Sequence, residues 1–209
     1  MGISIKSLEF LNDSINKCGL SLKGCRMVEL GNQELKEGFE LYNKKIAKKY
    51  FQSIGVDHIS IDINKKDGAL PINLNEEIED QFLIGTFDIL TNFGTTEHVI
   101  EQYMCWDNIH NLVKEKGIFV HIVPRKGNWK MHGYFKYSIE FFKTLSRKME
   151  YSIIDISIMK SNNLKDLICC SMIKNKNNDF IPIELFEALE IDKDLKMFEK
   201  LKLKEMRDK

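Results

Sequence analysis

The alternation of short apolar runs with segments of helical periodicity constrains the fold of this chain more than any other feature. Apolar runs that stop at a glycine or a polar residue are typical of buried strands, and apolar residues spaced three or four apart are typical of helices. We expect strands at 26–31, 58–63, 87–92, 117–124, 151–158 and 167–173, with a short extended piece at 69–74. This order predicts an α/β fold, in which helices cover both faces of a mostly parallel, twisted sheet.

Helices are expected at 5–18, 34–51, 99–113 and 139–149. In the first of these, Leu8, Leu11 and Ile15 lie at helical spacing. Gly117 follows the third, where we expect it to cap the carboxyl end of the helix. The last two strands are separated by no long helix, so we expect them to pair as an antiparallel hairpin at one edge of the sheet.

A length of 209 residues suits one α/β domain. We assign residues 1–191 to this domain and residues 192–209 to a charged, helical C-terminal tail. Leu195, Phe198 and Leu201 fall on one side of that tail. It is interpreted either as a solvated helix docked on its own domain or as a helix that contacts a partner, for example in a homodimer.

The charge balance argues against nucleic acid as a partner. Lys and Arg number 31, Asp and Glu number 31, and the formal net charge is zero, whereas nucleic-acid-binding proteins usually carry a basic surplus. No run approaches the roughly 20 apolar residues of a membrane span, and residues 1–6 do not resemble the start of a signal peptide. We therefore expect a cytoplasmic protein without a membrane partner.

The five cysteines fit the same location, because their number is odd and no C-x-x-C pair occurs. We expect all of them to be reduced thiols. Cys169 and Cys170 lie within an apolar run that resembles a buried strand. They are interpreted as packed small hydrophobic residues in preference to reactive thiols.

The residues that follow the strands indicate a nucleotide site, because ligands of open α/β sheets bind outside the carboxyl ends of the strands. Gly31 ends the first strand, and a glycine there lets the chain turn tightly and a ligand come close. The helix expected after it would offer free N–H groups to an anionic group. Asp62 ends the second strand, where a carboxylate can accept hydrogen bonds from both ribose hydroxyls.

A dinucleotide is the less suitable ligand, because its pyrophosphate is normally bound by a G-x-G-x-x-G loop. Here Gly31 stands alone, with Gln33 and Leu35 where further glycines would be expected. Asp62 also follows Gly31 by 31 positions, against roughly 20 in that fingerprint. A nucleoside with a small, charged amino-acid end fits better, and S-adenosylmethionine is such a ligand.

Several segments then occur in a recognisable order: Val28-Glu29-Leu30-Gly31, Phe87 to Asn92, Thr96-Glu97-His98-Val99, Val113 to Val120 with Val123-Pro124, and Tyr134 to Phe142 with Tyr151. From about Gly24 to Ile158 the chain resembles the class I S-adenosylmethionine-dependent methyltransferases of the small-molecule type. The resemblance implies a Rossmann-like methyltransferase fold with S-adenosylmethionine as the cofactor.

The resemblance also implies which residues contact the cofactor. They are Glu29, Gly31, Asn32 and Gln33 at its amino-acid end, Asp62 at the ribose, Ile63, Asn73 and Leu74 at the adenine, and Asn92 and Gly94 at the methionine moiety. Other interpretations stay open for four of them. Glu29 can be a structural acid that accepts from nearby N–H groups, Asp62 a turn residue at a strand end, and Asn92 with Gly94 a plain turn.

Two histidines are candidates for a general base, a role that suits an imidazole near neutral pH. His98 follows the strand at 87–92 and is alternatively a structural residue. His132 lies in the loop 125–134, where we expect the acceptor to bind, and Arg125 and Tyr134 are candidate substrate contacts in the same loop. Arg125 would suit a phosphate or carboxylate. The loop can also be an ordinary solvated one.

His121 is interpreted as a core residue of its strand. No Cys/His cluster has the spacing of a zinc site, so no metal is expected.

The implied reaction is in-line transfer of a methyl group to an oxygen or nitrogen of a small metabolite. Because the loop at 125–134 is short and no separate recognition domain is evident, our hypothesis for the acceptor is a hydroxylated compound such as a sugar or sugar nucleotide. The alternatives are a non-catalytic binding protein of the same fold, which the glycine-poor loop 32–35 motivates, and a nucleotide-dependent oxidoreductase, which the missing G-x-G-x-x-G disfavours.

Overall fold

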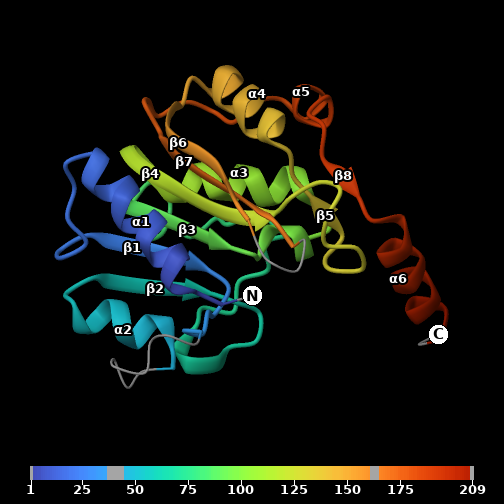
Figure 1. Ribbon diagram of the computed structural model, residues 1–209, viewed down its shortest axis with the longest axis horizontal. Coiled ribbons are helices and arrows are strands. Elements are labelled where there is room, and N and C mark those ends of the chain that lie inside the picture. The colour runs from blue at the N-terminus through green and yellow to red at the C-terminus, as the bar shows by residue number, and fades with distance from the viewer. Residues whose placement is uncertain (1, 37–44, 161–164, 208–209) are drawn as a thin grey trace.

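A computed structural model describes residues 2–36, 45–160 and 165–207 of the chain. Its centre is a six-stranded sheet with the order β2-β1-β3-β4-β7-β6, covered by helices on both faces (Figure 1). The strands are β1 (Arg26–Leu30), β2 (Asp57–Ile61), β3 (Phe87–Phe93), β4 (Val113–Pro124), β6 (Ser152–Met159) and β7 (Leu167–Ile173). The expected mostly parallel α/β fold is confirmed.

The strand order reverses direction at β1, which pairs in parallel with β2 on one side and with β3 on the other. The chain therefore leaves β1 toward one edge of the sheet and returns to β3 on the opposite side. Such a switch point opens a crevice at the carboxyl ends of the two central strands. Gly31 and Gly94 follow β1 and β3 there.

The expected antiparallel hairpin is also confirmed, since β7 pairs antiparallel with both β4 and β6, and β6 forms the edge. Cys169 and Cys170 lie in β7 and pack into the cores on opposite faces of the sheet. Burial raises the pKa of both thiols. The structure describes all five cysteines, and none of them is in a disulfide.

Five helices flank the sheet in two layers (Figure 1). α1 (Ile5–Lys17) and α2 (Ala47–Ser53) pack on one face, and α3 (Gln102–Leu112), α4 (Ile139–Met149) and α5 (Ile183–Glu187) on the other. Serine side chains cap the N-termini of two of these helices. The hydroxyl of Ser4 accepts the N–H of Ser7 in α1, and the hydroxyl of Ser138 accepts the N–H of Phe141 in α4.

The expected helix at 34–51 is wrong over its first part, since α2 begins only at Ala47. Leu35 instead forms a parallel bridge with Ile3, and Glu34 bridges Ile46. The backbone at 34–36 thus bonds to the N-terminal segment and to 45–46, and these longer-range bonds override the local helical spacing. Residues 37–44 lie outside the described part of the chain.

The expected cap at Gly117 is wrong as well, because α3 ends at Leu112 and Gly117 lies inside β4. Val113 already pairs with Phe87 of β3, so the chain is extended before the glycine is reached. A Cβ at position 117 would lie 3.0 Å from the carbonyl oxygen of Phe87. The glycine thus permits a close approach of two strands.

The extended piece expected at 69–74 forms one parallel bridge, between Leu70 and Ile61. Farther along the chain, the short strands β5 (Phe135–Lys136) and β8 (Asp192–Lys193) pair antiparallel ahead of α6 (Leu195–Arg207), which projects away from the sheet (Figure 1).

Phe198 joins α6 to the body, with its ring centroid 5.2 Å from Tyr134 and 5.5 Å from Phe135. Leu195, expected on the same side, is exposed. The division into a domain and a tail stays a prediction. No helix in the described ranges is both long and apolar enough to cross a membrane.

Trp106 of α3 is the centre of the larger core. It is 2 % exposed, and its ring centroid lies 4.9 Å from His121, 5.0 Å from Phe141 and 5.9 Å from Phe142. Its indole N–H donates to the side-chain oxygen of Gln102 at 3.3 Å, so the polar edge of the ring is also satisfied.

Replacing Trp106 by alanine should therefore lower the free energy of unfolding by about 3–5 kcal/mol, because it leaves a large cavity that the sheet cannot close. Trp106→Phe keeps most of the volume and should cost less. Urea unfolding followed by circular dichroism measures both variants. Equal losses in the two would contradict this account of the core.

Candidate functional site

A cavity of about 320 Å³ lies at the switch point, where β1, β2 and β3 end. A volume of this order suits a small-molecule ligand. Eight of the residues expected to contact the cofactor line it: Gly31, Asn32, Gln33, Asp62, Ile63, Asn73, Leu74 and Gly94. Ile61, Ile72, Asn75, Thr95, His98 and Val99 complete the lining.

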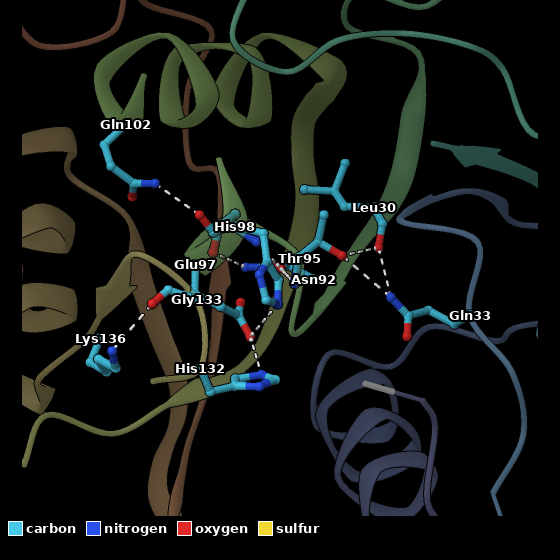
Figure 2. Close-up of polar contacts among 11 residues, drawn as sticks. Leu30, Gln33, Asn92, Thr95, Glu97, His98, Gln102, His132, Gly133 and Lys136 are labelled. Carbon is cyan, nitrogen blue, oxygen red and sulfur yellow. Dashed lines mark hydrogen bonds and ion pairs between the residues drawn. The ribbon is translucent and has the colours of Figure 1, made fainter. Parts of the chain in front are cut away.

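The loops after β1 and β3 meet at Gly31, whose φ is +80°. A Cβ there would lie 2.6 Å from the hydroxyl oxygen of Thr95 and 2.7 Å from the side-chain nitrogen of Gln33. The Thr95 hydroxyl donates to the carbonyl oxygen of Leu30 at 2.7 Å and ties the two loops together (Figure 2). Sequence reasoning missed Thr95, although it directly follows Gly94.

Asp62 links the loop after β1 to the end of β2. One of its carboxylate oxygens accepts the backbone N–H of Asn32 at 2.8 Å, and the other accepts that of Asn64 at 2.9 Å. A carboxylate has about four acceptor positions, so these two bonds fix its orientation and leave capacity for a ligand.

Two cavity-lining residues of the loop after β1 carry buried hydrogen-bond acceptors. The side-chain oxygens of Asn32 and Gln33 are buried and find no hydrogen-bond partner among the described residues. The backbone N–H groups of Gly31, Asn32 and Gln33 already donate within the chain. The expectation that a helix directly after β1 offers free N–H groups is wrong, because α2 begins at Ala47.

Asn73 lines the cavity, but its side chain is engaged in a turn. Its oxygen accepts the backbone N–H of Asn75 at 3.1 Å and the side-chain amide of Asn75 at 2.8 Å, and its nitrogen donates to Glu76. Its expected contact with adenine stays a prediction.

Glu29 lies near the end of β1 and is not among the lining residues of the cavity. Its carboxyl group is fully buried, accepts the N–H of Gln33 at 3.3 Å and lies 3.8 Å from the ring of His58. Burial raises the pKa of Glu29 to about 8 and lowers that of His58 to about 4. Both groups are therefore mainly uncharged at neutral pH.

Asn92 is also buried outside the lining and shapes the turn that carries Gly94. Its side-chain oxygen accepts the N–H groups of Thr95 and Thr96 at 3.2 and 3.3 Å, and its nitrogen contacts the Nδ1 atom of His121 at 3.2 Å. His121 is buried at the core, as expected, and burial lowers its pKa to about 3.

The two histidines proposed as bases meet at the rim of the cavity, together with Glu97 (Figure 2). Glu97 and His98 lie in the short 3-10 helix η3 (Thr96–His98), and His132 approaches them from the loop 125–134. The Nε2 atom of each histidine lies 3.9 Å from the Oε1 atom of Glu97. Glu97 is fully buried, which raises its pKa to about 8. Desolvation lowers the pKa of both histidines.

Glu97 was not singled out from the sequence, where it stood only within the motif that carries His98. Its contact with His132 joins positions more than thirty residues apart, and no local spacing indicates such a contact.

Arg125 and Tyr134 lie away from the cavity lining. The Arg125 guanidinium pairs with Asp166 at 3.1 Å. Tyr134 donates its backbone N–H to the carbonyl oxygen of Glu97 at 2.7 Å, and its ring packs on Phe198. Their contacts with a substrate stay predictions.

Comparison with known proteins bears on the fold. No family model and no curated protein sequence matches the chain. Among solved structures, it is similar to the 1,6-didemethyltoxoflavin-N1-methyltransferase of Burkholderia thailandensis, with a TM-score of 0.57, 13% identity and coverage of 80% of this chain and 78% of that one. The fold is that of S-adenosylmethionine-dependent methyltransferases.

Two further structures share this methyltransferase fold. The geranyl diphosphate C-methyltransferase of Streptomyces coelicolor A3(2) matches with a TM-score of 0.53 and 9% identity, over 81% of each chain. An S-adenosylmethionine-dependent methyltransferase of Mesorhizobium loti matches with a TM-score of 0.50 and 10% identity, over 73% of this chain and 92% of that one. The Burkholderia and Streptomyces structures contain S-adenosylhomocysteine, and they show that one fold serves N- and C-methylation.

The buried carboxyl of Glu29 predicts a pH-dependent stability. Its folded pKa of about 8 lies above the ordinary value of 4.5, so its contribution is fully present below about pH 4.5 and is lost as the pH rises toward 8, by at most about 1.4 kcal/mol per pH unit. Glu29→Gln should remove this loss, and its stability relative to the parent should rise between pH 5 and pH 8. Urea unfolding at each pH measures it. Glu9→Gln, at an exposed position, is the control, and the same trend in both variants would contradict the prediction.

Proposed function

We propose that this chain binds S-adenosylmethionine in the cavity at the switch point and transfers its methyl group to a small-molecule acceptor. The observation that carries the proposal is the position of the cavity in a methyltransferase fold, with Asp62 among its lining residues and with buried acceptor oxygens, unpartnered within the described ranges, on the lining residues Asn32 and Gln33. The cofactor supplies the activated methyl group when bound.

The cavity residues fit the parts of this cofactor. The buried side-chain oxygens of Asn32 and Gln33 find no partner in the described part of the chain, and they suit the ammonium of an amino-acid end. The Asp62 carboxylate, fixed by two backbone N–H groups, suits a pair of ribose hydroxyls. Ile72, Leu74 and Val99 add apolar walls for the adenine.

For the acceptor we propose a hydroxyl or amine of a small metabolite, with a sugar or sugar nucleotide as the first class to test. His98 lines the cavity and His132 lies beside it, with ring centroids 5.1 Å apart. Because both pKa values are lowered, both imidazoles are unprotonated at neutral pH. An acceptor hydroxyl can therefore give its proton to either ring, while the rim holds the acceptor in line.

Thermal unfolding with S-adenosylhomocysteine tests the cofactor site. At about 100 times its dissociation constant, a ligand stabilises the folded state by about 2.7 kcal/mol, which corresponds to a rise in Tm of roughly 5–11 °C for a chain of this size. We expect this rise in the parent and its loss in Asp62→Ala.

Asp57→Ala is the matched control, because Asp57 begins β2, at the end of the strand opposite to Asp62, and is largely exposed; it should keep the rise. NADH should give none. A rise in Tm with NADH alone would favour the oxidoreductase alternative. No rise with either ligand would contradict the proposed cofactor site and would mean that the chain shares only its fold with the methyltransferases. A rise without methyl transfer to any acceptor would favour the non-catalytic alternative.

Incubation with methyl-labelled S-adenosylmethionine and a panel of acceptors tests the reaction. We expect label on sugar nucleotides, sugars or small amines. If the acceptor is a hydroxyl, replacing the histidine that serves as the base should slow transfer by roughly 10²–10⁴-fold. The transfer rates of His98→Ala and His132→Ala show which histidine has this role. Transfer only to proteins would contradict the proposed acceptor class.

A further inference from the structure

We propose that Glu97, His98 and His132 bind one divalent transition-metal ion at the rim of the cavity. The three side chains bring one carboxylate oxygen and two imidazole nitrogens within 4.8 Å of one another. This proposal concerns metal binding and does not depend on the proposed methyl transfer. It revises the expectation from the sequence that the chain has no metal site.

The separations are close to those of a metal site. Oε1 of Glu97 lies 3.9 Å from Nε2 of His98 and 3.9 Å from Nε2 of His132. Bonds of about 2.0–2.1 Å in tetrahedral geometry place neighbouring ligand atoms roughly 3.3 Å apart. Each histidine therefore has to approach Glu97 by about half an ångström, and the two histidine nitrogens, which lie within 4.8 Å of each other, have to close to a similar spacing. Both can do so, because the side chains of His98 and His132 are 46% and 34% exposed.

The carboxylate of Glu97 supplies an independent indication of a ligand. Its side chain is 0 % exposed, and neither of its oxygens has a hydrogen-bond partner in the described ranges. Nε2 of His132 is buried and equally without such a partner. An unpaired polar group in this position is costly, and a bound cation would satisfy both sets of atoms at once.

The buried ammonium of Lys136 does not fill this role. Lys136 contributes a favourable field at Glu97, but its Nζ atom donates to Asp194 at 2.5 Å and to the carbonyl oxygen of Gly133 at 3.3 Å. It holds the loop at Gly133 to Asp194, the residue before α6, and neither bond reaches Glu97.

The loop at 129–134 packs closely against Glu97. Gly133 has a φ of +70°, and a Cβ there would lie 2.8 Å from Cγ of Glu97. Trp129 and Met131 also have positive φ, at 54° and 61°, which is costly for such residues. The N–H of Tyr134 fixes the loop to the carbonyl oxygen of Glu97. His132 is therefore held over the carboxylate by the strained backbone around it.

Two imidazoles and one carboxylate suit Zn²⁺, Fe²⁺ or a neighbouring transition metal better than Mg²⁺ or Ca²⁺, which prefer oxygen ligands. Three protein ligands leave at least one position open. Since His98 also lines the cavity, we infer that the open position takes a hydroxyl or carboxylate oxygen of a small molecule held at the rim. A metal at this point lowers the pKa of a bound hydroxyl.

The test is titration of the full chain, without a polyhistidine tag and after removal of metals, with Zn²⁺ by calorimetry and with Co²⁺ by visible absorption. We expect one ion per chain. Glu97→Gln and His132→Asn should each weaken Zn²⁺ binding by at least about 10–100-fold, because mutation of residues that only support the ligands of a metal already costs this much. Both variants should also lose the visible absorption of bound Co²⁺.

Glu101→Gln, an exposed carboxyl next to η3, and Asp62→Ala should both keep the metal. Circular dichroism confirms that each variant is folded, and His132→Asn, on a surface loop, answers the question if Glu97→Gln does not fold. Zn²⁺ binding with equal affinity in the parent and in His132→Asn would overturn the proposal, as would no binding by the parent. Retained metal binding in Asp62→Ala would separate this site from the cofactor cavity.

Discussion

The close contact between the loops after β1 and β3 is the constraint on which the site depends. Thr95 can donate its hydroxyl to the carbonyl oxygen of Leu30 only because position 31 has no side chain. The contact brings the turn after β3 against the end of β1, so that Gly94 and His98 join Asp62 around one cavity. A methyl or larger group at position 31 would separate the loops and open the cavity along its floor.

Two buried carboxyl groups flank this contact, and each is poorly satisfied by the chain itself. Glu29 lies under the loop after β1 and accepts one backbone N–H, while Glu97 follows the turn after β3 and has no hydrogen bond to its carboxyl oxygens within the described residues. Native proteins pair nearly all buried polar groups, and exceptions concentrate where a ligand or a reaction needs them. These two unsatisfied carboxyl groups therefore lie at the same end of the sheet at which the strand order predicts a ligand site.

Local patterns in the sequence predicted what depends on local chemistry. The apolar runs gave the strands and their hairpin, and Gly31 and Asp62 could be assigned to strand ends because ligand sites of such sheets follow the strands. The errors arose where distant segments decide. The backbone at Leu35 bonds to Ile3, which removes the helix expected there, and Gly117 permits strand pairing where a helix cap was expected. Likewise, the contact of Glu97 with His132 depends on a loop whose path no periodicity describes.

The cavity and the Glu97 cluster share one residue, which couples the two sites. His98 contributes its ring to both, so a ligand that fills the cavity and an ion held at the rim would lie in adjacent positions. With its pKa lowered, the ring of His98 is neutral at physiological pH and can either take a proton or bind a metal, but one nitrogen cannot do both at once. If Nε2 binds an ion with Glu97 and His132, such an ion would supply the activation of an acceptor hydroxyl, and His98 would not be available through this atom to take the proton. The histidine-base and metal mechanisms are therefore exclusive at this atom, and occupancy of the cluster decides between them.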